Sequence, residues 1–146
     1  MLRSTLGWHI FYRCVTRDSI LWEVPMLKAH YLHHVTVTVT DLDRAKDFYG
    51  RILGLQELPR RGVKGSDGAW YQIGPSQINL LRREKPEPDS ARHFAVCVDS
   101  IQAARQALQA EGLEMTETTQ VGNIDRFFFA DPDGNRVEIV CPMGQG

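Results

Sequence analysis

The sequence has no excess of charge and no long hydrophobic run. Its 146 residues carry 17 basic and 18 acidic side chains, a formal net charge of −1. This balance gives no electrostatic indication of a nucleic acid or an anionic membrane as partner. No apolar run approaches the roughly 20 residues that a membrane-spanning helix needs. We therefore expect a soluble domain that binds neither nucleic acid nor membrane.

Cysteine is also scarce. Cys14, Cys97 and Cys141 are an odd number, and no two of them form a CxxC pair. The pattern excludes a disulfide framework and indicates a reducing compartment, so we expect a cytoplasmic protein. Buried reduced thiols are the ordinary interpretation of such cysteines.

The first 25 residues lack the periodicity of the rest of the chain. Their apolar stretch is broken by Arg13, Arg17 and Asp18, and no small-residue cleavage site follows, so the segment is a poor signal peptide. It is either a weak targeting segment or a translated extension ahead of a start at Met26, and we favour the extension.

A strand and a helix are predicted in the segment LHHVTVTVTDLDRAKDFYGRILGL, residues 32–55. Valine and threonine alternate from Val35 to Thr40, which is the period of a strand. Asp41 is a good N-cap and Gly54 a good C′ residue for a helix between them. The apolar residues of that helix fall at helical spacing and are expected to pack in the core.

The second half repeats this plan, beginning with RHFAVCVDSIQAARQALQAEGL at 92–113. Asp99 or Ser100 would cap its helix. The following landmark pairs are 58 or 59 residues apart: His34 and His93, Gly54 and Gly112, Leu55 and Leu113, Asn79 and Glu138. A period held across so many landmarks indicates an internal duplication.

Each copy is predicted to be a βαβββ module, which gives an α+β fold with two pseudo-symmetric modules. The later strands are expected near Leu55–Leu58, Ala69–Gly74, Gln77–Arg82, Leu113–Thr118, Ile124–Ala130 and Arg136–Cys141. The sequence DPDGNR is expected to be a hairpin turn without a catalytic role.

The predicted domain boundaries follow from this pattern. Residues 1–29 would form an extension outside the fold, 30–142 a single domain, and 143–146 a tail. Within the domain, module one would span 30–82, a linker rich in charge and proline 83–91, and module two 92–142.

The duplication also indicates which histidines are candidates for a functional role. Only His34, among the three in HYLHH, has a counterpart at the common spacing. If the modules pack pseudo-symmetrically, two imidazoles and a carboxylate on strands could meet and bind a divalent metal. Solvated histidines and a paired carboxylate are the ordinary alternative, and the residues alone leave both open. The positions concerned are His34, His93, Asn79 and Glu138; His30 and His33 keep the ordinary interpretation.

These motifs, together with GAWYQIG and FFFADPDGNRVEIV, resemble the vicinal oxygen chelate superfamily. The resemblance covers about three quarters of the chain, from about Tyr31 to Pro142. The superfamily includes glyoxalase I, extradiol dioxygenases, fosfomycin-resistance thiol transferases and bleomycin-binding proteins. The resemblance implies that the modules form a cupped, open, mixed β-sheet barrel with helices outside.

The resemblance also implies one divalent metal ion per site, Fe, Mn, Ni or Zn. The family's metal ligands correspond to His34, His93 and Glu138, and Glu138 would also be the catalytic residue. Asn79 departs from the pattern, because glyoxalases carry a glutamate at this position. An amide is a weak metal ligand and cannot act as a base near neutral pH.

The function that we expect is that of a metal-dependent, glyoxalase-like enzyme, related to lactoylglutathione lyase. Its small substrate would be chelated through two adjacent oxygens, with the metal as Lewis acid. An extradiol dioxygenase is the first alternative, because two histidines and one glutamate are its metal ligands. A metal-free, bleomycin-binding type of module is a further alternative.

Two sequence features argue against alternative activities of the family. Phenylalanines occupy the place where dioxygenases of this family tend to have an acid–base tyrosine. A thiol transferase would use Thr36 but needs basic residues, of which only Arg126 is evident. The candidate pocket residues are Thr36, Trp70, Gln72, Asn79 and Arg126.

A homodimer is also expected, because small two-module chains of this family often build each site from two subunits. The Pro- and charge-rich linker would let the modules exchange partners. His34 of one chain would then meet His93 and Glu138 of the other.

Overall fold

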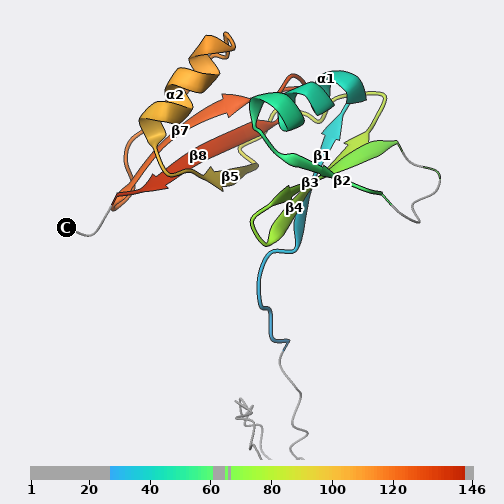
Figure 1. Ribbon diagram of the computed structural model, residues 1–146, viewed down its shortest axis with the longest axis horizontal. Coiled ribbons are helices and arrows are strands. Elements are labelled where there is room, and N and C mark those ends of the chain that lie inside the picture. Colours follow the sequence, from blue (N-terminus) through green and yellow to red (C-terminus); the bar gives the residue numbers. More distant parts are fainter. Residues whose placement is uncertain (1–26, 61–64, 66, 144–146) are drawn as a thin grey trace, which may run out of the picture. The chain divides into compact units, whose positions relative to one another are not determined.

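The structure, a computed structural model, describes residues 27–60, 65 and 67–143 (Figure 1). The predictions for residues 1–25, for Cys14 and for most of the tail concern residues outside this described part, so they stay predictions. From Leu32 onward the chain forms one unit. No helix among the described residues is long and apolar enough to cross a membrane.

The first module forms a four-stranded sheet in the order β1-β4-β3-β2, in which only the β1–β4 pair is parallel. Val37 and Val39 of β1 are buried, whereas Thr36 is exposed on the opposite face. The elements of the module are β1 (His34–Val39), α1 (Leu42–Lys46), η1 (Asp47–Ile52), β2 (Gln56–Leu58), β3 (Gly68–Ile73) and β4 (Ser76–Arg82).

The second module repeats this topology in the order β5-β8-β7-β6, again with one parallel pair. Its elements are β5 (His93–Cys97), α2 (Ile101–Ala110), β6 (Thr116–Glu117), β7 (Ile124–Ala130) and β8 (Arg136–Pro142). The registers agree as well, since Thr36 pairs with Asn79 as Ala95 pairs with Glu138. The predicted α+β fold of two pseudo-symmetric βαβββ modules is confirmed, and the two sheets do not close into a barrel.

The first helix differs from the single α-helix that was predicted. Asp41 caps it as expected, its carboxylate accepting the Arg44 N–H at 3.1 Å. After α1 the helix widens into a π-helix, in which the Leu53 N–H bonds to the Phe48 carbonyl at 2.9 Å. The wider turn places two successive aromatic rings in the core, because Phe48 and Tyr49 are each at most 1% exposed.

The second helix begins at Ser100, whose hydroxyl accepts the Ala103 N–H at 3.2 Å, so Ser100 rather than Asp99 is the cap. The helix ends at Ala110 with Glu111 as its C-cap, and Gly112 follows with a φ of 71°, which favours glycine. The next strand, β6, is shorter than predicted. Leu113 does not start this strand, because its N–H still donates to the Leu108 carbonyl and so caps the C-terminal end of the helix.

The turn between β7 and β8, predicted as a simple hairpin turn, also joins the two modules. The Tyr49 hydroxyl donates to Asp131 at 2.9 Å, and the Asn135 amide donates to the Thr38 carbonyl at 2.9 Å. The Thr40 hydroxyl and N–H both donate to the Asp133 carboxylate. Burial, with the Asp131 carboxylate next to it, raises the pKa of Tyr49, so the hydroxyl keeps its proton and donates.

Candidate functional site

Three neighbouring strands of module two bring the predicted residues of that module onto one face. His93 on β5 pairs with Arg136 on β8, and Glu138 on β8 pairs with Phe128 on β7. Residues in register share a face of the sheet, and so do residues two apart on a strand. His93, Arg136, Glu138 and Phe128 therefore lie on one side, together with Arg126.

His93 and Glu138 are in contact. The Nε2 atom of His93 lies 3.2 Å from Oε2 of Glu138, whose other oxygen accepts from Nη1 of Arg126 at 2.8 Å. Glu138 is only 6% exposed. Buried carboxylates need such partners, because an unpaired buried charge is strongly destabilising.

The imidazole of His93 is also fixed from its other side. Its Nδ1 lies 2.9 Å from the Ala91 carbonyl, which can only accept, so Nδ1 carries a proton. Nε2 then either holds a second proton, forming an ion pair with Glu138, or presents its lone pair beside the carboxylate. The second arrangement is a pair of donors for a cation, and a histidine held by a backbone carbonyl is typical of metal ligands.

His34, the third predicted ligand, does not join this pair. It is exposed at the start of β1, and its Nδ1 lies 3.0 Å from Nδ1 of His33, to which no role was assigned. Within the described ranges, no group of three or more His, Cys, Asp or Glu residues could hold a metal. The structure thus brings together two of the three predicted ligands.

Asn79, the counterpart of Glu138, lies in register with Thr36 and Trp70 on the same face of module one. Within the part of the chain that the structure describes, its Oδ1 is buried without a hydrogen-bond partner, and so is the hydroxyl oxygen of Thr38. A buried acceptor left unpaired costs about 1–3 kcal/mol.

The remaining predicted pocket residues have other contacts. Gln72 closes the β3–β4 turn, donating its amide to the carbonyls of Gly74 and Ser76 at 2.7 and 3.0 Å. The guanidinium of Arg60 lies 5.7 Å from the Trp70 ring centroid. Arg126 holds Glu138 and also donates from Nε to the Thr119 carbonyl at 3.1 Å.

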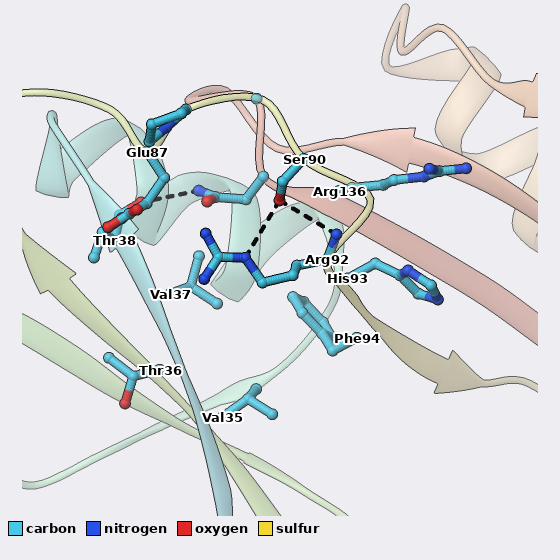
Figure 2. Close-up of a pocket in the computed structure, with 13 residues that line it drawn as sticks. Val35, Thr36, Val37, Thr38, Glu87, Ser90, Arg92, His93, Phe94 and Arg136 are labelled. Carbon is cyan, nitrogen blue, oxygen red and sulfur yellow. Dashed lines mark hydrogen bonds between the residues drawn. The ribbon is translucent and has the colours of Figure 1, made fainter.

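A pocket of about 450 Å³ lies between β1 and the start of β5. Of the predicted residues, Thr36 and His93 line it, whereas Trp70, Gln72, Asn79 and Arg126 do not. Figure 2 shows the Arg92 side chain extending toward β1, while His93 and Arg136 point away from it.

Sequence reasoning missed Arg92 and Arg136. The available signal for Arg136 was its position two residues before Glu138, which puts both side chains on one face of the strand. For Arg92 the only signal was its place directly before His93.

A sequence profile described as the Glyoxalase/Bleomycin resistance protein/Dioxygenase superfamily matches residues 31–139. The chain belongs to this superfamily. The uncharacterized protein YaeR of Escherichia coli (strain K12) is 33% identical over 127 residues, which cover 78% of this chain and 98% of that protein.

Solved structures of the superfamily have the same fold. One is that of a protein from Bacillus anthracis that is assigned to the glyoxalase family. Its TM-score is 0.74 at 27% identity, and the match covers 80% of this chain and 98% of that chain. A mutant of FosX from Listeria monocytogenes, complexed with Mn(II) and 1S,2S-dihydroxypropylphosphonic acid, has a TM-score of 0.69. It is 20% identical, covering 80% of this chain and 95% of that one, so the likeness shows the fold alone.

Proposed function

We propose that the protein is a divalent-metal-dependent enzyme of this superfamily that acts, like glyoxalases, on a small substrate chelated through two adjacent oxygens. One observation carries the proposal. His93 Nε2 and Glu138 Oε2 lie 3.2 Å apart, and the far nitrogen of the imidazole is anchored on a backbone carbonyl. Such a pair is suited to ligating one cation between them.

The donors present fit a metal ion. His93 offers Nε2, and Glu138 offers Oε2, since Oε1 is held by Arg126. Nitrogen and carboxylate donors of this kind suit Fe, Mn, Ni or Zn. The Mn(II) in the FosX complex is consistent with a divalent ion in this fold.

His34 is the third donor in this proposal and comes from a second copy of the chain. Within one chain it lies against His33 rather than with His93 and Glu138. We therefore propose a homodimer in which module one of each chain completes the site on module two of its partner.

When bound, the metal would hold the two substrate oxygens and stabilise the negative charge that develops on them. Among the described residues, Glu138 is the one carboxylate of the site, and it would take a proton from one substrate carbon and return it to the neighbouring carbon. Arg126 orients that carboxylate through Oε1. Asn79 cannot share this task, because an amide is not a base.

An extradiol dioxygenase is the second candidate. The loss of an ionisable group at Asn79 favours it, because two histidines and one carboxylate suffice for this iron chemistry. The ring of Phe128 lies next to the pair, at 87° to the His93 ring and with centroids 5.1 Å apart.

The test is metal analysis of protein purified without added metal, followed by activity screens. We expect one divalent ion per chain and isomerisation of a hemithioacetal. Oxygen uptake with catechols, in place of isomerisation, would support the dioxygenase. A protein that takes up no divalent metal but binds bleomycin would overturn the proposal in favour of a metal-free binding module.

A further inference from the structure

Arg136 is a cation without an acidic partner on the face that carries the candidate metal ligands. It is the register neighbour of His93 and precedes Glu138 by two residues on β8. Across the described part of the chain, its guanidinium has neither a salt bridge nor a hydrogen bond to an acceptor. Arg126, on the same face, is by contrast paired with Glu138.

A phenylalanine ring holds the Arg136 guanidinium in place. Its Cζ lies 3.8 Å from the ring centroid of Phe128, a side chain that is only 6% exposed. The His93 ring contacts the same ring, at an interplanar angle of 87°. A guanidinium lying over a ring is attracted by the face of the ring, and its N–H groups remain available for an acceptor.

The charges around this ring do not balance. Arg126 and Arg136 both lie over Phe128, at 5.6 and 3.8 Å, and among the described residues Glu138 is the one carboxylate paired with either of them. Both oxygens of Glu138 are engaged, one by Arg126 and the other by His93. Figure 2 shows Arg136 pointing away from Glu87. One positive charge is therefore left over, and a half-buried cation favours an anionic partner.

We propose that Arg136 binds an anionic oxygen group of the substrate, either a carboxylate or a phosphoryl or phosphonyl group, next to the His93–Glu138 pair. The inference rests on the proposed function, because it places this group beside the two chelated oxygens. The substrate is then a small acid. A planar guanidinium can donate two parallel N–H bonds to either kind of anion, which an ammonium cannot match.

The experiment measures anion binding to protein freed of metal by a chelator, with inorganic phosphate and, separately, acetate as probes. The Nε–H signal of each arginine is followed by NMR. We expect the Arg136 signal to shift and saturate with at least one probe, and the preferred probe tells phosphoryl from carboxylate recognition. Saturation with neither probe would overturn the inference.

Three variants sharpen the result. Arg136→Met keeps an apolar contact with Phe128 but removes the charge, and it should weaken binding of the probe by at least about tenfold. Arg136→Lys should restore binding in part. Arg83→Gln, which removes the same charge outside the pocket, should bind like the wild type. Equal weakening by Arg83→Gln and Arg136→Met would show unspecific attraction and overturn the inference.

Metal binding is measured on the same proteins, so the two proposals can fail separately. Saturable phosphate binding in a protein that takes up no metal would refute the proposed metal enzyme but support the anion site. Metal uptake without any anion binding at Arg136 would refute only the anion site.

Discussion

The two modules have the same topology and register but present different chemistry on equivalent faces. Asn79 in module one stands where Glu138 stands in module two, and Gln77 where Arg136 stands. Trp70 is the register partner of Asn79, as Phe128 is of Glu138. The face of module one carries His34 and, over Trp70, the guanidinium of Arg60. That of module two carries two arginines, a histidine and a buried glutamate.

The difference indicates a division of roles between duplicated halves. Module two holds a cluster of charged side chains in which, among the described residues, Arg136 has no acidic partner. We propose that this cluster anchors a metal and an anion. Among the described residues, module one has two buried oxygens without a hydrogen-bond partner, Asn79 Oδ1 and Thr38 Oγ1, and the exposed imidazole of His34. In our account module one completes and shapes the site, and module two does the chemistry.

Removing the charge of Glu138 should have the largest effect. Glu138→Gln keeps the shape and can still accept from Arg126, but it loses the anionic donor. We expect metal affinity to fall by about 100-fold or more. Titration with Mn(II) or Zn(II) measures it, and the matched variant is Asn79→Ala on module one. Equal losses in the two variants would mean that the faces do not differ in role.

The contacts between the β7–β8 turn and module one should matter for stability and not for metal binding. Tyr49→Phe removes the hydroxyl that donates to Asp131, a carboxylate that is 5% exposed. We expect the free energy of unfolding to fall by about 1–3 kcal/mol. Denaturant unfolding measures this. Metal affinity should stay at the wild-type value, and a marked loss of affinity would show that these contacts and the site are coupled.

Substitutions at Asn79 test whether the face of module one can be made chemically similar to that of module two. Asn79→Ala should lower metal affinity by less than about tenfold, because the net contribution of a neutral hydrogen bond is about 1 kcal/mol. Asn79→Glu recreates a second carboxylate and should raise isomerisation of a hemithioacetal, if a missing base limits that reaction. Activity absent from both forms would favour the dioxygenase.

The smallest expected effect is on the pH dependence of stability. Burial raises the pKa of Asp131, against opposing hydrogen bonds from Asn135, Tyr49 and Asp133. A raised carboxyl pKa means that the folded state binds the proton more tightly, so this group's contribution to stability declines as pH rises above 3.8. Asp131→Asn should remove that decline. Unfolding curves between pH 4 and 7 of both proteins test it, and parallel pH profiles would contradict it.

Much of the fold, and the placement of His93 and Glu138 on one face, could be predicted from the sequence, because spacing and alternation are local signals. The offset of 59 residues between His34 and His93, and between Asn79 and Glu138, is the offset seen in the strand registers. Strand alternation then placed Glu138 on the face of His93.

What could not be predicted depends on packing between distant segments. The bond from Tyr49 to Asp131 joins residues 82 positions apart, and no local pattern marks it. The π-helical turn at Asp47–Ile52 keeps a nearly helical period, so its apolar spacing looked like an ordinary helix. Arg136 was missed because its guanidinium is held by the ring of Phe128 on another strand.

The central claim is that module two of one chain binds the metal together with His34 of another. Mixing His34→Ala chains with Glu138→Ala chains, each deficient alone, tests it directly. In the mixed dimer, one site keeps His34, His93 and Glu138, so about half of the dimers should recover one tight site, measured by metal content after gel filtration. No recovery in a confirmed mixed dimer, or a wild-type protein that is a monomer with full metal content, would contradict the account.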